Sequence, residues 1–539
     1  MNKTGKIILS VSIIGWVLIG VLLLNTDAVN AKEDLKEVNI YKKLRLFNEV
    51  LFKVQENYVE DINVEDLLDS AIEGMLDETD PHTNFFEPDD FENFNSSTKG
   101  EFGGLGISID KKGKYITVVS PIEGTPAYRL GIMAGDKIIA VDGESVVDVD
   151  TDEAIKKMRG DVGTKVVITM ERPGVEKHLD FEIVRDIIKI ESIPYAFKLD
   201  SGIGYLRVRQ FNANTTKEMR ESLDKLEEEG IRGLLIDLRF NPGGLLREAV
   251  DTVNEFIGKD KRVVFTKGRT PETNYEYYTK YNRMRTGYPV VVLINEASAS
   301  AAEIFAGSLQ DWDKGLVVGK TSFGKGSVQR LFPLSDGNGI KITTAKYYIN
   351  SGRCIHKDLN DKLLKGEDVS EEERKEADVK SHEDSYYTEE GRLVYGGGGV
   401  TPDIELEQSR LTKLGVELRR KNTIFDFSVN YMLDHEAEVT EEFEANKKLV
   451  DELLVTAKID SIEFEEADVD STYIWIENTL TSNIIGRKFG NVESYKVSIK
   501  EDSQLQKALK LFEEHNTLKN MFEYSAGLQK EEDKELEVE

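Results

Sequence analysis

The strongest constraint on the fold is a pair of near-continuous apolar runs in the middle of the chain, at residues 233–238 and 290–294. Each run is followed by a turn that contains glycine or serine, and then by a helical pattern of apolar residues. A strand that is apolar on both of its faces is typical of a parallel sheet covered by helices. We therefore predict a multidomain α/β protein whose buried core spans about residues 186–407.

Composition excludes several classes of protein. A chain of 539 residues is long enough for several domains. It carries 100 Asp and Glu against 70 Lys and Arg, a net charge of −30, which argues against nucleic-acid binding because phosphate backbones need clustered cations. Cys354 is the single cysteine and the six histidines show no paired spacing, so we expect no disulfide, no metal site and no cofactor.

The N-terminal residues 1–31 are predicted to direct the chain to a membrane. An uncharged apolar run covers residues 7–24, with Lys3 and Lys6 before it. This is the pattern of a signal peptide or of an uncleaved anchor, and the small residues at 29–31 leave both readings open. The positive flank predicts that the N-terminus stays in the cytoplasm and that the body lies outside it.

Four further regions follow from changes in pattern. Residues 32–102 read as helical, with a break at residues 80–82, and residues 103–185 read as a small domain of short β-branched strands. The core contains a charged insertion at about 357–395, of which residues 357–384 are expected to be a solvated insertion or a flexible loop. Residues 408–539 read as an acidic, mostly helical C-terminal domain whose tail from Lys530 is expected to be disordered.

Ser300 is the candidate nucleophile. It lies among small residues in the turn after the run at 290–294, just before a helix with Ile304 and Leu309 on its apolar face. A hydroxyl at such a turn lies beside the free N–H groups of the helix start, which can stabilise a developing oxyanion. The alternative is an ordinary N-cap serine of an α/β helix.

Lys325, between two glycines, is the candidate base for that serine. A lysine accepts a proton at neutral pH only if desolvation lowers its pKa, and a Gly-flanked loop after a short apolar strand permits such burial. Gln329 follows four residues later and is expected to orient the amine by hydrogen bonding. Residues 319–325 also fit the GxxxxGK pattern of a phosphate-binding loop, but Gly326 replaces the hydroxyl that binds magnesium there.

Two glycine-containing segments are candidate backbone donors. Gly243 and Gly244 follow the run at 233–238, where an N–H could form an oxyanion hole together with that of Ala301; a simple strand-to-helix turn is the alternative. The β-rich domain opens with a Gly-rich loop whose consecutive N–H groups could hold the terminal carboxylate of a peptide, although alone it also fits a hairpin turn. The residues of this loop are Gly103, Gly104, Leu105, Gly106 and Ile107.

Taken together, these motifs resemble the carboxy-terminal processing peptidases of serine family S41. The resemblance covers about residues 41–403 and rests on four segments around a PDZ-like domain. These are Asp80-Pro-His-Thr, Asp237-Leu-Arg-Phe-Asn-Pro-Gly-Gly244, Ser298-Ala-Ser-Ala-Ala-Glu303 and Phe323-Gly-Lys-Gly-Ser-Val-Gln329.

The resemblance implies a function and a fold. It implies a crotonase-like (ClpP-like) core in which Ser300 is the nucleophile, Lys325 the base and Gln329 the orienting residue of the base. It also implies an endopeptidase that captures the C-termini of exported proteins on its PDZ domain, in the periplasm or at the outer face of the inner membrane. The competing hypothesis is a non-catalytic PDZ scaffold on a protease-like core. The substrate and the oligomeric state are not encoded in these motifs.

Overall fold

A computed structural model of the chain describes residues 40–366, 368–370, 373 and 384–536. The apolar run at 7–24, predicted as a signal peptide or anchor, lies outside the described residues. Within the described ranges, no helix is long and apolar enough to cross a membrane. The chain divides into two compact units, Met1–Thr79 and Asp80–Glu539.

The described part of the first unit is helical, as the apolar spacing predicts. A helix covers residues 40–57, and α2 covers Val64–Asp77, with the side chain of Asn63 accepting the Glu65 N–H at its N-terminus. The apolar side chains of the first helix are nevertheless exposed: Leu44 at 55% and Phe47 at 42%. Periodicity thus predicts the helix here, but not burial of its apolar face.

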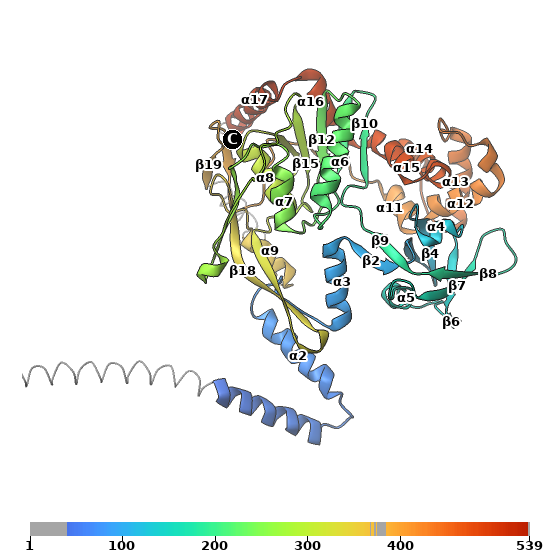
Figure 1. The fold of residues 1–539 in the computed structure, drawn as a ribbon. Coiled ribbons are helices and arrows are strands. Elements are labelled where there is room, and N and C mark those ends of the chain that lie inside the picture. The colour runs from blue at the N-terminus through green and yellow to red at the C-terminus, as the bar shows by residue number, and fades with distance from the viewer. Residues whose placement is uncertain (1–39, 367, 371–372, 374–383, 537–539) are drawn as a thin grey trace, which may run out of the picture. The chain divides into compact units, whose positions relative to one another are not determined.

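The second unit is built around a six-stranded sheet with the order β10-β11-β12-β15-β16-β21 (Figure 1). β10 is antiparallel to β11, and the other neighbours are parallel. Leu234 and Ile236 face one side of the sheet and Leu235 faces the other, all fully buried, which confirms the predicted α/β core. The strands are β10 (Tyr195–Lys198), β11 (Ile203–Arg207), β12 (Gly233–Asp237), β15 (Val290–Ile294), β16 (Leu316–Gly319) and β21 (Ile404–Glu405).

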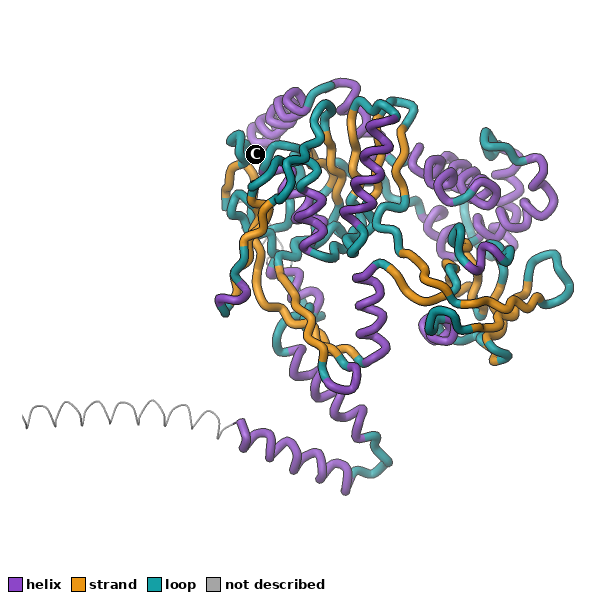
Figure 2. The backbone as a smooth tube through the Cα atoms, in the orientation of Figure 1, coloured by secondary structure: helices purple, strands orange, loops and turns teal. Residues whose placement is uncertain are grey.

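Helices cover both faces of this sheet (Figures 1 and 2). One face packs against α6 (Thr215–Glu228), α7 (Leu246–Val253) and α8 (Ala301–Asp311). The other packs against α16 (Ser503–Glu514) and α17 (Leu518–Leu536) from the end of the chain. The sequence predicts a separate C-terminal domain with a disordered tail from Lys530. Instead, the last two helices return to the core, where Met521 and Phe522 in the first turns of α17 are buried against the sheet. The helix α17 continues to Leu536.

A second sheet lies beside the core and carries the segment after Lys325. Its order is β1-β18-β13-β14, and β17 pairs with the outer part of β18. Its strands are β1 (Asn84–Phe86), β13 (Arg262–Gly268), β14 (Glu276–Tyr278), β17 (Ser327–Pro333) and β18 (Gly339–Ile349). The helix α3 (Pro88–Lys99) follows β1 along the chain.

The β-rich domain has its own core of fully buried residues, among them Ile116, Ile138 and Ile168. Its sheet has the order β3-β4-β5-β7-β8, with β6 beside β5, and the two-stranded ribbon of β2 and β9 leads into and out of it. Its elements are β2 (Glu101–Gly104), β3 (Ile107–Lys112), β4 (Tyr115–Pro121), α4 (Pro126–Arg129), β5 (Lys137–Val141), β6 (Glu144–Ser145), α5 (Thr151–Met158), β7 (Lys165–Glu171), β8 (Leu179–Val184) and β9 (Asp186–Lys189).

The described part of the charged insertion contains regular elements, while residues 367, 371–372 and 374–383 lie outside the described residues. It begins with the helix α9 (Asp358–Leu364) and ends with the hairpin of β19 (Ser385–Tyr387) and β20 (Leu393–Tyr395). Lys357 N–H donates to the carbonyl of Gly324, which lies in the loop of the candidate base. After β21, four helices form a bundle with a core of its own: α11 (Lys413–Arg420), α12 (Thr423–His435), α13 (Lys447–Ile459) and α14 (Glu466–Phe489). The helix α15 (Asn491–Ser498) follows and packs against α14.

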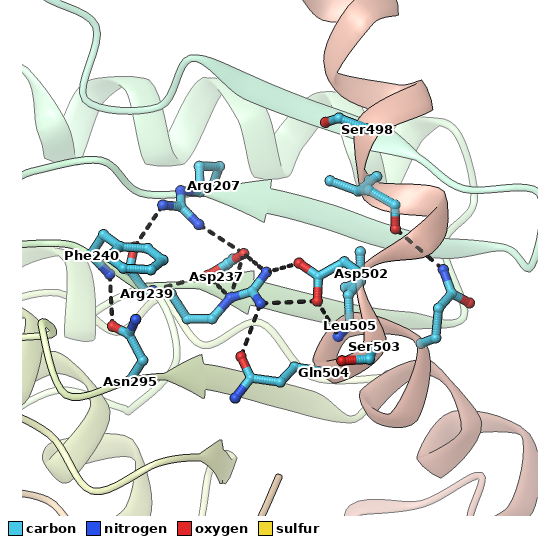
Figure 3. Close-up of polar contacts among 12 residues, drawn as sticks. Arg207, Asp237, Arg239, Phe240, Asn295, Ser498, Asp502, Ser503, Gln504 and Leu505 are labelled. Carbon is cyan, nitrogen blue, oxygen red and sulfur yellow. Dashed lines mark hydrogen bonds and ion pairs between the residues drawn. The ribbon is translucent and has the colours of Figure 1, made fainter. Parts of the chain in front are cut away.

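A buried ion-pair network joins the end of β12 to the C-terminal helices (Figure 3). The fully buried carboxylate of Asp237 accepts Nη2 of Arg239 at 2.8 Å and Nη1 of Arg207 at 2.9 Å. Arg239 also binds Asp502, the N-cap of α16, at 2.6 Å. Burial raises the pKa of Asp237, but the two guanidinium groups lower it more, to about 2.

We predict that Asp237→Asn destabilises the protein by about 3 kcal/mol at neutral pH, because it removes the buried counter-charge of Arg207 and leaves Asp502, among the described residues, as the only carboxylate paired with Arg239. The pKa of Asp237 is lowered in the folded state, so its contribution is present above the ordinary value of 3.8 and is lost as the pH falls through about 2. Urea unfolding checks this, with Asp200→Asn, an exposed position after β10, as the control. Equal midpoints for the two variants would contradict it.

Candidate functional site

Ser300 lies where the carboxyl end of β15 meets the start of α8. It is the N-cap of α8, and its backbone has φ 54° and ψ −113°, a region that residues other than glycine rarely occupy. Strained backbone of this kind occurs mainly at functional sites, where the surroundings hold it in place. The carboxyl edge of a parallel sheet is also where α/β folds bind their ligands.

Glu303 holds the Ser300 turn and the Lys325 loop together. Its buried carboxylate accepts the N–H of Ser300 at 2.7 Å and that of Lys325 at 2.9 Å. The Gly324 N–H at 2.7 Å and the Ser322 hydroxyl at 2.5 Å complete the set. Burial raises the pKa of Glu303 to about 7, although these hydrogen bonds oppose the rise. Glu303 is a site residue that the sequence pattern could have indicated, because Ser-x-x-Glu before an apolar helix is the pattern of a capping box.

Lys325 lies in the loop between β16 and β17. Burial lowers the pKa of Lys325, and the neighbouring positive charge of Lys341 lowers it further. In the described part of the chain, its Nζ has no hydrogen-bond or ion-pair partner, so the amine is not occupied by a structural contact. The hydroxyl of Tyr347, absent from the sequence analysis, donates to the carbonyls of Lys325 at 2.6 Å and Ser300 at 3.1 Å.

Gln329 does not bond to Lys325, contrary to the expected orienting contact. Its Nε2 donates to Oγ of Ser327 at 3.0 Å and to Oγ1 of Thr343 on β18 at 3.2 Å. Four residues separate neighbours on a helix, but Gln329 belongs to a strand, where each residue adds about 3.3 Å. The spacing therefore overstated how close the two side chains lie.

Of the two glycines after β12, Gly243 lies against the Ser300 turn and Gly244 lies against the backbone of Phe211. A Cβ added to Gly243 would lie 2.7 Å from Cβ of Ser300 and 2.9 Å from N of Ala301, and Gly243 has φ 98°. Its N–H is taken by Oδ1 of Asn241 at 2.8 Å. The N–H groups of Gly244 and Ala301 donate to no acceptor among the described residues, so these two are the available donors.

The Gly-rich loop of the β-rich domain is shorter than the five residues predicted. Gly103 and Gly104 lie in β2 and pair with β9, and Ile107 begins β3. The carbonyls of Leu105 and Gly106 accept the N–H groups of Ala127 and Ile122, whereas their own N–H groups have no acceptor in the described structure. Gly106 has φ 80°, and an added Cβ would lie 2.2 Å from Cβ of Thr125.

The described residues contain no group of three or more His, Cys, Asp and Glu side chains that could hold a metal ion. The groups that the structure places at the strand ends are a serine beside helix N–H donors, a desolvated lysine and free backbone donors. This set suits acyl transfer, in which a nucleophile, a base and an oxyanion site are needed together.

Comparison with known proteins agrees with this chemistry. The sequence matches the profile of peptidase family S41 over residues 202–361 and that of a PDZ domain over residues 117–172. It is 40% identical over 323 residues to a carboxy-terminal-processing protease of Bartonella bacilliformis, covering 59% of this chain and 74% of the relative. It is 31% identical over 409 residues to the carboxy-terminal processing protease CtpA of Bacillus subtilis, covering 76% and 82%.

Among solved structures, the photosystem II D1 C-terminal processing protease is similar at 26% identity with a TM-score of 0.36, covering 67% of this chain and 92% of that one. The two relatives above exceed 30% identity and are covered over more than two thirds of their length. The chain therefore belongs to the carboxy-terminal processing proteases, serine-type peptidases of family S41 that carry a PDZ domain.

Proposed function

We propose that the protein cleaves polypeptides with a Ser300/Lys325 dyad. The observation that carries the proposal is the bonding of Glu303, whose single carboxylate accepts the backbone N–H of both residues. One side chain therefore holds the nucleophile and the base in fixed relation. The lowered pKa of Lys325, caused first by burial, favours the neutral amine that a general base requires.

In the proposed mechanism, the neutral amine of Lys325 accepts the hydroxyl proton of Ser300 as Oγ bonds to the scissile carbonyl carbon. The N–H groups of Gly244 and Ala301 stabilise the oxyanion, while Gly243 keeps the turn in place through Asn241. The Lys325 ammonium then gives its proton to the leaving amine as the C–N bond breaks. Water, activated by the same lysine, hydrolyses the acyl-enzyme.

The proposed substrates are exported proteins with free, apolar C-termini. The free N–H groups of Leu105 and Gly106 support capture of a terminal carboxylate, and buried apolar residues surround the loop. The apolar run at 7–24, with its positive flank, supports a body outside the cytoplasm, either anchored in the inner membrane or released to the periplasm.

We expect Ser300→Ala and Lys325→Ala each to reduce turnover of an unfolded protein with an apolar C-terminus by at least about a thousandfold. Loss of either member of a dyad removes the same proton transfer, so the double variant should be no worse than the single ones. The measurement is cleavage by the full-length protein in mild detergent. Lys320→Ala, a lysine of the same loop that pairs with Glu405 and Glu407, is the control. Activity retained in Ser300→Ala would refute the dyad.

Glu303→Gln should change the pH dependence of stability. The pKa of Glu303 is raised in the folded state, so wild type binds an extra proton and loses stability as the pH rises from 4.5 to about 7. The shift corresponds to roughly 3 kcal/mol. Thermal unfolding across this range should show a decline in wild type relative to Glu303→Gln, and a constant difference between them would contradict the prediction.

Gly106→Ala should weaken binding of carboxylate-ended peptides by about tenfold or more, because the added methyl group collides with Thr125 and closes the loop. Fluorescence anisotropy with a labelled apolar peptide measures this, with the C-terminal amide of the same peptide as the reference ligand. Gly113→Ala is a matched control, since Gly113 also has positive φ but has open space around its Cβ position. Equal affinity for acid and amide in wild type would count against carboxylate capture.

A further inference from the structure

The Asp80–Thr83 turn begins the second unit and has no role in the mechanism proposed above. It is held by its own polar groups: Oδ1 of Asp80 accepts the His82 N–H at 2.9 Å, and Oδ2 accepts the Thr83 hydroxyl at 2.9 Å. Thr83 is buried, and β1 follows at once and pairs with β18. The turn is therefore a rigid element of the sheet that carries the segment after Lys325.

One chain of hydrogen bonds runs from this turn to Gln329. The hydroxyl of Thr343 donates to Oδ1 of Asp80 at 3.0 Å and accepts from Nε2 of Gln329 at 3.2 Å. The N–H of Thr343 also donates to the Thr83 hydroxyl at 3.2 Å. Asp80 thus anchors the strand pair β17–β18 at the point where Gln329 lies, just after the base loop.

A second chain of contacts runs to the other side of the base loop. Nε2 of His82 lies 3.5 Å from Oδ1 of Asp361 on α9, and the second oxygen of Asp361 lies 3.2 Å from Nε2 of His356. The other ring nitrogen of His356 accepts the N–H of Gly326 at 3.4 Å. Gly326 is the residue directly after Lys325, so the turn reaches the base loop from two directions.

The charges around Lys325 come from four different elements. Asp80 of the turn, Glu303 of α8 and Asp361 of α9 favour its ammonium form, and Lys341 of β18 opposes it. The amine of Lys341 lies 5.4 Å from the ring centroids of both Phe86 and Phe94. Asp80 and Lys341 therefore act on the base with opposite sign.

We propose that the Asp80–Thr83 turn is a positioning element for the base, in which Asp80 orients the Lys325 loop through Thr343 and Gln329 and balances the charge of Lys341. The inference rests on the proposed role of Lys325 as general base. It gives the turn at residues 80–83 a part in catalysis, although the turn does not touch the reacting atoms.

The test is the pH dependence of kcat/KM for full-length Asp80→Asn and Lys341→Met. Asp80→Asn removes a negative charge that favours the ammonium form, so the acidic limb of the profile should move to lower pH. Lys341→Met removes a positive charge, so the same limb should move to higher pH. In addition, kcat of Asp80→Asn should fall by roughly tenfold to a hundredfold, since a misplaced base loses catalytic efficiency, while KM should stay near the wild-type value.

Two further variants separate positioning from a general loss of structure. Asp90→Asn changes an exposed aspartate ten positions further along the chain, in α3, and should match wild type in both kcat and the acidic limb. Asp80→Glu keeps the charge, so its acidic limb should stay near the wild-type position even if the longer side chain lowers kcat or stability.

Limbs that move in the same direction in Asp80→Asn and Lys341→Met, or that do not move, would overturn the inference. So would an Asp80→Asn profile equal to that of Asp90→Asn. Ser300→Ala and Lys325→Ala are measured in parallel. If both are silent, such results reject the positioning role alone, whereas cleavage by either of these two variants would reject the proposed dyad itself.

Discussion

The arrangement of the site depends on two buried carboxylates that are fully occupied by donors. Asp237 ends β12 and is neutralised by Arg207 and Arg239, so the chain leaves the sheet in a fixed direction toward the Gly243 turn. Glu303 lies in the first turn of α8 and accepts four donors from the Ser300 turn and the Lys325 loop. Leaving such a group without partners in a dry interior costs several kcal/mol, which makes each arrangement nearly all-or-none.

The need to pair buried charged groups also connects distant parts of the chain to the site. Asp502 of the C-terminal region forms an ion pair with Arg239, and the apolar side of α16, which follows Asp502, packs on the sheet. Asp80 lies far before the core in sequence, yet it reaches β18 through Thr343. The base loop is therefore surrounded by the turn at 80–83, by α8, by α9 and by β18, and each contributes one charged group that acts on Lys325.

The local sequence pattern correctly predicted the elements whose structure depends on residues nearby in the chain. The strands at 233–238 and 290–294, the small-residue turn at Ser300 and the glycines at 243 and 244 all lie where the spacing places them. Patterns that needed a distant partner were less informative. The spacing of Lys325 and Gln329 suggested contact, but β17 is extended and Gln329 donates to Thr343. The charge pattern of the insertion likewise did not indicate that Asp361 lies close to His82 and His356.

By itself, the sequence determined the α/β class and the small β-rich domain, because apolar periodicity and turn composition are local properties of the chain. The resemblance of its motifs to family S41 added the PDZ assignment and the roles of the candidate residues in acyl transfer. Only the tertiary structure decided that Glu303 joins the Ser300 turn to the Lys325 loop, that Asn241 removes Gly243 from the available donors, and that the last helices cover the sheet. These depend on which buried polar groups meet, and residues far apart in sequence satisfy one another only after the chain has folded.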